Sequence, residues 1–306
     1  MGRYIAGLLG GVVRLRPPDV DIRPLFGPGP ASRLRGLLRL LPGSYALAET
    51  ARAIKLWRER LSVYHETNHA APRFAGPVVL TIHDLSTVLH PQTQDPRRAR
   101  HFAQALLLRA RDAARVITPT AAIAEEVVRH LGVAREKVRF IHHGVDALFV
   151  PDARVEREPF VLFVGAEGPR KGLDTLRAAL PPGCRLVQAG PPRFVPEAEL
   201  LSLYRRASAL VLPSIYEGFG FPLIEAFACG TPAIASDDPA LLEVAGGAAL
   251  HFPRGDAAAL RKQLTRVLGD PALRGELSAR GLERARLFRW DDCAAAHLDV
   301  YLEAAG

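Results

Sequence analysis

The sequence of 306 residues has little of what several classes of protein need. It holds three cysteines, Cys184, Cys229 and Cys293, which lie far apart and form no CxxC pair. We therefore expect no disulfide framework and no thiolate metal site, and a reducing compartment. The longest apolar run, from Tyr4 to Val13, has ten residues, of which three are glycine, and is too short to cross a bilayer. No small-residue cleavage site follows it, so it predicts a helix docked on a core rather than a signal peptide.

The chain also lacks the common patterns of divalent-metal sites. It contains no HExxH motif and no DxD flanked by apolar strand residues, the pattern that a metal-dependent sugar transferase would need. The sequence Asp237-Asp238-Pro239 fits a turn and a helix N-cap better than a metal site. We expect neither a metal nor a cofactor.

The charge favours an anionic partner without identifying it. Forty basic residues against 32 acidic ones give a net charge of +8, which suits nucleotide phosphates, anionic lipid headgroups or nucleic acid. The basic residues are dispersed and are not interleaved with aromatic ones, so nucleic acid is not expected as a partner. Residues 33–41 and 46–61 resemble basic amphipathic helices that dock on an anionic membrane surface.

From about residue 76 the chain alternates short β-branched runs with amphipathic stretches, which is typical of βαβ units and parallel sheets. The polar stretch 151–159, bounded by prolines, separates two such series and predicts a linker. The length also suits two domains. We expect an α/β protein of two doubly wound halves with a ligand cleft between them, at the carboxyl ends of both sheets.

The most informative stretch is Pro213–Pro232, with the sequence PSIYEGFGFPLIEAFACGTP. A strand ends at Leu212, a glycine-containing loop follows, and Pro222 stands at the start of a helix, where proline is favoured. Glycines in this loop let backbone N–H groups approach a ligand at the positive end of the helix dipole. Glu217 and Glu225 can then face one ligand from two directions, since a carboxylate accepts hydrogen bonds from sugar hydroxyls. The plainer alternative is a strand–turn–helix whose glutamates complement the helix dipole.

The Pro213–Pro232 segment resembles the E-x7-E motif of retaining, GT-B-fold glycosyltransferases of family 4, with a mannosyltransferase-like subgroup favoured. Four other stretches match this family in the same order, and the likeness covers roughly residues 76 to 290. They are Thr81–Asp84, Val116–Thr120, Ile141–Asp146 and Val161–Gly172. The resemblance implies three parts: an acceptor-side Rossmann-like domain over residues 1–152, a donor domain over 153–289, and a C-terminal helix over 290–306 that packs back on the first domain.

The resemblance also implies roles for individual residues. Arg170 and Lys171, in the loop after Gly165, stabilise the leaving diphosphate, since arginine clamps phosphate oxygens and lysine adds a point charge. Many members carry an arginine directly after that glycine, where this chain has Ala166. The donor contacts implied in the Pro213–Pro232 segment are Glu217, Gly218, Phe219, Gly220 and Glu225, with Glu225 holding the ribose and Glu217 the donor sugar or phosphate.

Histidines end two strands of the first half. His83 follows a run of apolar and small residues, so it is expected at the edge of the cleft, where it lines the reacting face of the sugar. Asp84 either caps a helix or fixes the tautomer of His83. His143 and Asp146 suit a role in the cleft wall or the hinge. A single histidine at a strand end is more often structural, and only the resemblance favours catalysis.

One departure concerns the beginning of the chain. The family begins with a strand and a glycine-rich loop, whereas Gly2-Arg3-Tyr4 resembles the tail of that loop. A first domain without its central strand would expose two unpaired edges, which is costly. It would affect acceptor binding more than donor binding.

The expected reaction is retaining, metal-independent transfer of a hexose from a nucleoside-diphosphate sugar, with GDP-mannose favoured over UDP-glucose, to a glycan or lipid-linked hydroxyl acceptor. The expected location is the cytoplasm, with peripheral binding to the inner face of the membrane. Two alternatives stay open: an inactive nucleotide-sugar-binding or scaffold protein, and a GT-B sugar-nucleotide epimerase.

Overall fold

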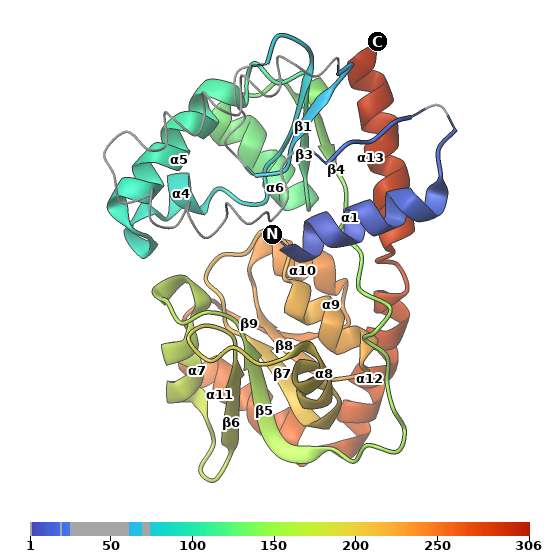
Figure 1. The fold of residues 1–306 in the computed structure, drawn as a ribbon. Coiled ribbons are helices and arrows are strands. Elements are labelled where there is room, and N and C mark those ends of the chain that lie inside the picture. The colour runs from blue at the N-terminus through green and yellow to red at the C-terminus, as the bar shows by residue number, and fades with distance from the viewer. Residues whose placement is uncertain (1, 19, 25–60, 69–73) are drawn as a thin grey trace.

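The computed structural model describes residues 2–18, 20–24, 61–68 and 74–306, and these ranges form two α/β halves (Figure 1). The basic helices predicted within residues 33–61 fall, apart from Leu61, outside the described residues. Each half is built on a parallel sheet with helices on both faces. The structure confirms the predicted fold class of two doubly wound halves.

The first sheet has the strand order β1-β2-β3-β4, with every pair parallel. Its strands are β1 (Tyr64–Glu66), β2 (Val78–Thr81), β3 (Arg115–Thr118) and β4 (Val138–Phe140). Alternate residues of β2 and β3 point to opposite faces, as a strand requires. Leu80 and Val116 pack on one face under α4 (Ser86–Leu89), α5 (Pro96–Arg109) and α6 (Ala121–Glu126). Val79 and Ile117 pack on the other face.

The second sheet has the order β6-β5-β7-β8-β9, again all parallel. Its strands are β5 (Glu158–Val164), β6 (Arg185–Ala189), β7 (Ala207–Leu212), β8 (Ala233–Ser236) and β9 (Leu250–Phe252). The central strand β7 is buried along its whole length. Two hydrophobic clusters cover the two faces. The helices of this half are α7 (Leu173–Ala179), α8 (Glu197–Arg206), α9 (Phe221–Ala228), α10 (Pro239–Ala245), α11 (Ala257–Gly269) and α12 (Pro271–Ala285).

Helix starts follow local capping chemistry. The Thr120 hydroxyl accepts the N–H of Ile123, and α6 continues through a π turn to Leu131, where Gly132 ends it in the left-handed conformation. The Asp256 carboxylate accepts the N–H of Ala259 at the start of α11. Threonine and aspartate are residue types favoured at this position.

The last helix, α13 (Trp290–Ala305), returns to the first half and lies beside α1 (Gly2–Leu15) (Figure 1). Together they cover the open face of the first sheet with a buried cluster that includes Tyr4, Leu8 and Val12 of α1 and Trp290 of α13. Glycines allow this close approach. A Cβ atom at Gly7 would lie 2.0 Å from the Trp290 ring, and one at Gly11 would lie 2.6 Å from the Trp290 carbonyl oxygen.

Within the described ranges, no helix is long and apolar enough to cross a membrane.

The packing of α1 on α13 predicts opposite effects for two neighbouring glycines. Gly7→Ala should lower the free energy of unfolding by about 1 to 3 kcal/mol, because the new methyl group overlaps the Trp290 ring. Gly10→Ala is the matched control, since its Cβ would meet only the mobile end of Arg14 at 3.3 Å. It should leave stability unchanged or raise it by up to roughly 1 kcal/mol through helix propensity. Urea unfolding measures both, and equal effects of the two changes would contradict the packing.

Candidate functional site

Two loops meet where adjacent strands of the second sheet end. The strands β5 and β7 are parallel neighbours, so the loop 165–172 and the Pro213–Pro232 segment leave the same edge of the sheet. The Ile215 N–H donates to the Arg170 carbonyl oxygen at 2.8 Å. Gly172 has a φ of 64°, and a Cβ there would lie 2.0 Å from the Pro213 carbonyl oxygen. Only glycine therefore allows the basic loop to lie this close to the Pro213–Pro232 segment.

The Glu217 carboxylate is the centre of this edge. It is buried, and its Oε1 accepts hydrogen bonds from Lys171 Nζ at 2.6 Å and from Ser214 Oγ at 2.7 Å. Arg170 donates from Nη1 to the Tyr216 carbonyl oxygen at 2.7 Å and lies 3.8 Å from Glu217 Oε2. Burial acts to raise the pKa of Glu217, but the charges of Lys171 and Arg170 outweigh it and hold the pKa below its usual value. The carboxylate is therefore ionised and paired.

A second carboxyl group lies against Glu217. Asp238 accepts the N–H groups of Ala240 and Leu241 as the cap of α10, and the Glu217 N–H donates to its Oδ2 at 3.3 Å. The predicted N-cap role of this residue is confirmed. Burial, and then the negative charge of Glu217, raise the pKa of Asp238 to about 6. The sequence indicated the cap but not this neighbour.

Glu225 lies in α9, and its side chain is only 2% exposed. Its Oε2 accepts a hydrogen bond from the hydroxyl of Tyr204, in α8, at 2.6 Å. Its Oε1 forms an ion pair with Arg3, in α1 of the other half. Burial raises the pKa of Tyr204 well above its ordinary value, so this hydroxyl stays a hydrogen-bond donor. Both carboxylate oxygens are thus held from two sides.

The loop between the two glutamates presents backbone rather than side chains. Gly220 caps α9 with a φ of 87°, in the left-handed region that favours glycine. Among the described residues, the N–H groups of Gly218, Phe219 and Gly220 find no hydrogen-bond acceptor. The Phe219 ring packs into the core of the second half, so this predicted donor contact can act only through its backbone.

The predicted residues of the first half reach the same loop. A Cβ atom at Gly218 would lie 1.9 Å from the His83 carbonyl oxygen, so the two backbones touch. His83 Nε2 lies 3.0 Å from the Thr67 carbonyl oxygen. Asp84 accepts the Ser86 N–H at 2.8 Å from one position before Leu85, the N-cap of α4, so it binds the start of this helix without being its cap residue. The Thr120 hydroxyl donates to the Gly218 carbonyl oxygen at 3.1 Å.

His143 and Asp146 lie behind this contact, toward α13. The His143 ring stacks on Phe221 at a centroid distance of 5.1 Å and is buried, and among the described residues its Nδ1 has no hydrogen-bond partner. Burial, and then the neighbouring His83, hold the pKa of His143 well below its ordinary value. Asp146 accepts the indole N–H of Trp290 at 2.8 Å, which joins the connection between the halves to α13. These positions suit the predicted wall and hinge roles.

Gly165 ends β5 beside the basic loop. Its N–H donates to the Ala189 carbonyl oxygen at 2.9 Å, and a Cβ at Gly190 would meet the Gly165 carbonyl oxygen at 2.6 Å. The structure thus places the predicted second-half positions at one edge of the sheet. Sequence reasoning missed Ser214, Tyr204 and Arg3 as their partners. Ser214 lies inside the motif and was open to notice, whereas Tyr204 and Arg3 come from other elements and gave no signal.

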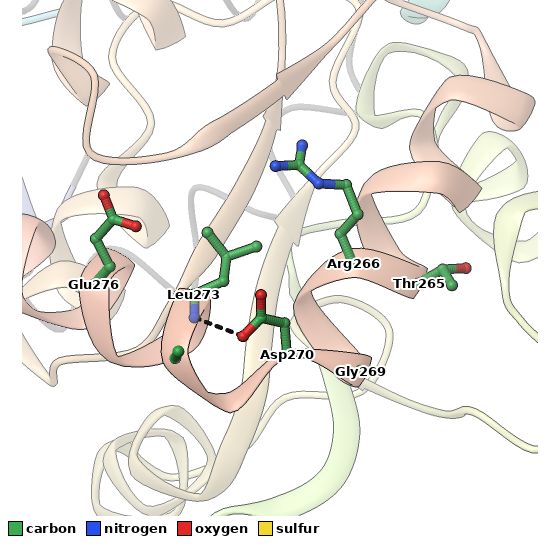
Figure 2. Close-up of a pocket in the computed structure, with 7 residues that line it drawn as sticks. Thr265, Arg266, Gly269, Asp270, Leu273 and Glu276 are labelled. Atoms are coloured by element: carbon green, nitrogen blue, oxygen red, sulfur yellow. Dashed lines mark hydrogen bonds between the residues drawn. The ribbon is translucent and has the colours of Figure 1, made fainter.

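Two other features bear on ligands. In the described part of the chain, no three histidine, cysteine, aspartate or glutamate side chains gather as metal ligands would. A hollow of about 440 Å³ lies at the turn between α11 and α12 (Figure 2). There the Asp270 carboxylate accepts the Leu273 N–H at 3.0 Å and so serves as a helix cap. None of the site residues described above lines this hollow.

Comparisons with known proteins show which family the chain resembles. A family model described as Glycosyltransferase Family 4 matches residues 9–147, and one described as Glycosyl transferases group 1 matches residues 188–284. The O-antigen chain mannosyltransferase B of Escherichia coli is 27% identical over 280 residues, which cover 78% of this chain and 74% of that protein. The glycogen synthase of Mycobacterium tuberculosis is 31% identical over 290 residues, which cover 81% of this chain and 70% of that protein.

The fold has a solved counterpart. The sucrose-phosphate synthase of Thermosynechococcus elongatus superposes with a TM-score of 0.72 at 24% identity, covering 98% of this chain and 92% of that one. The ordered motifs, the two doubly wound halves and the relatives agree. The chain therefore belongs to the GT-B glycosyltransferases of family 4.

Proposed function

We propose that this glycosyltransferase moves a hexose, with mannose favoured, from a nucleoside-diphosphate sugar to a hydroxyl acceptor with retention of configuration and without a metal. The observation that carries the proposal is the cluster of Lys171, Arg170 and Glu217 beside the N-terminus of α9, with Glu225 further along the same helix. This cluster offers cations for a diphosphate and carboxylates for sugar hydroxyls at one sheet edge.

The leaving diphosphate is stabilised by Arg170, Lys171 and the amide groups at the start of α9. Transfer of the hexose leaves a negative charge on the diphosphate, and fixed cations and amide dipoles stabilise that charge without a metal. Lys171 is already held in place by its hydrogen bond to Glu217 before the donor arrives, so it needs little reorganisation. When the diphosphate binds, Lys171 donates hydrogen bonds both to it and to the Glu217 carboxylate.

The ribose and the hexose of the donor bind to α9 and to the loop before it. Glu225 accepts hydrogen bonds from the ribose hydroxyls, and Glu217 with the amides of Gly218 to Gly220 binds the hexose. His83 lines the reacting face from the first half. The mannosyltransferase of E. coli supports mannose and hence a GDP donor, while the mycobacterial relative is a glycogen synthase. The acceptor is a glycan or a lipid-linked hydroxyl, met at the inner face of a membrane in the cytoplasm.

Donor binding has a direct test. Thermal shift and calorimetry with GDP, UDP, ADP and their sugars should find one nucleotide that stabilises the protein. A ligand at about 100 times its Kd stabilises the fold by roughly 2.7 kcal/mol. Glu225→Gln and Lys171→Ala should each weaken this nucleotide about 10- to 100-fold, the effect of losing a hydrogen bond to a charged group.

Lys262→Ala is the matched control, because Lys262 is exposed on α11. Lys171→Ala leaves the Glu217 charge less compensated and so weakens the fold. The double variant Lys171→Ala/Glu217→Gln removes both charges and separates this loss of stability from a loss of binding. Full affinity in Glu225→Gln and in the double variant would show that the donor site is elsewhere.

The transfer itself predicts a stereochemical outcome. With the preferred nucleotide sugar and a simple glycoside acceptor, the new bond should have the anomeric configuration of the donor. NMR coupling constants of the first product measure it. Inversion would contradict retention, nucleotide binding without transfer or hydrolysis would indicate an inactive binding protein, and turnover without an acceptor would indicate an epimerase.

Metal independence is tested separately. Dialysis against EDTA should leave the transfer rate within about twofold of the untreated rate, because Arg170, Lys171 and the α9 amides supply the charge stabilisation that a metal would otherwise give. Loss of activity in EDTA, with recovery on adding Mg²⁺ or Mn²⁺, would contradict this assignment.

A further inference from the structure

Arg3 joins the first half of the molecule to the donor side of the second. It lies in the first turn of α1, and its Nη1 forms an ion pair with Glu225 Oε1 on α9. The guanidinium also lies over the Phe149 ring, 5.3 Å from its centroid. No sequence motif indicated this contact. It brings a cation from the other half to the carboxylate that is assigned to the ribose.

The ion pair leaves binding capacity on both partners. A carboxylate has about four lone-pair positions, and Glu225 uses one for Tyr204 and one for Arg3. Two therefore remain for two ribose hydroxyls. A guanidinium has five N–H donors in a planar fork. With the described residues, Arg3 forms no ion pair other than that with Glu225, and a third of its side chain is exposed.

The charge balance of the site supports a ligand role for this arginine. The two cations assigned to the diphosphate, Arg170 and Lys171, both lie within 4 Å of the Glu217 carboxylate, which offsets part of their charge. The residue after Gly165 is Ala166, which adds no cation there. A diphosphate beside a ribose held by Glu225 would thus meet Arg3 as a further cation, from the opposite half.

We propose that Arg3 is a donor-binding residue: its guanidinium stays on Glu225 and donates its remaining N–H groups to the phosphate next to the ribose. This inference rests on the proposed function. Because Arg3 belongs to the first half, the contact forms only when the two halves are together, so donor binding favours their approach.

The test is to measure by calorimetry the affinity for a nucleoside diphosphate and for the matching nucleoside, using the base that the unmodified protein prefers. Arg3→Ala should weaken the diphosphate roughly 10- to 100-fold, as expected for a lost charge-assisted hydrogen bond, and the nucleoside less than about threefold. Arg3→Lys should recover part of the loss, because it keeps a positive charge without the fork. The control is Arg14→Ala on the same helix, where Arg14 pairs with Asp291 at 2.7 Å away from Glu225. It should change neither affinity.

A second background keeps the test decisive if Arg3→Ala folds poorly by leaving Glu225 unpaired. In Glu225→Gln protein that charge is absent, and Arg3→Ala should still weaken the diphosphate more than the nucleoside. Equal losses for both ligands would mean that Arg3 only orients Glu225. Unchanged or tighter binding of the diphosphate in Arg3→Ala would mean that Arg3 only pairs with Glu225 and does not contact the ligand. Either result overturns the inference while leaving the proposed function intact, whereas failure of the unmodified protein to bind any nucleoside diphosphate would overturn both.

Discussion

Two carboxylates buried on one short segment impose the constraint that the rest of the site satisfies. Glu217 and Glu225 are 9% and 1% exposed. A buried ion without a partner costs several kcal/mol, so each needs a cation or several hydrogen-bond donors nearby. The loop that follows strand β5 provides Lys171 for Glu217, and helix α1 provides Arg3 for Glu225. One pair lies within a half and the other joins the two halves.

The two ion pairs therefore respond differently to a change in the arrangement of the halves. Lys171 and Glu217 are positioned by adjacent strands, so their pair persists whatever the relation between the halves. Below a pH of about 6, Asp238 carries a proton, and less negative charge then faces Glu217. The Glu225 pair depends on α1 and therefore on the contact between the halves. In the proposed donor site the diphosphate end is thus preformed, whereas the ribose end is completed by Arg3 from the other half.

The sequence predicted what local chemistry decides. The strand–loop–helix of the Pro213–Pro232 segment, the Asp238 cap and the alternation of the second half all depend on near neighbours, and the structure has them. Strand β1 was missed because three residues, Tyr64 to Glu66, have no pattern of their own and are a strand only through pairing with β2. The burial of the Phe219 ring was not predicted, because loop spacing does not reveal that a ring points into the core. The Arg3 contact was out of reach for the same reason, since it exists only once α1 packs on α13.

The backbone contact between His83 and Gly218 closes the edge at which the hexose is proposed to bind. The two backbones leave no room for even a methyl group, so a hexose cannot lie between the His83 face and the amides of Gly218 to Gly220 in this arrangement. Several hydrogen bonds hold it closed, including Thr120 to Gly218, and Glu243 of α10, which accepts the first two N–H groups of α6. Binding of a hexose to these amides, as proposed above, therefore requires the halves to separate at this edge.

The two connections between the halves lie behind this contact, beside the stacked rings of His143, Phe221 and Trp290. There the chain crosses between the halves at the connection that follows Asp146 and again before Trp290, and the Asp146–Trp290 hydrogen bond joins the two crossings. A groove of about 1030 Å³ runs between these crossings and α1. Because α1 packs closely on α13 through Gly7 and Gly11, it belongs with the first half, and Arg3 belongs with it. A movement that separates His83 from Gly218 would therefore take Arg3 away from Glu225, so the proposed sugar and ribose contacts would open and close together.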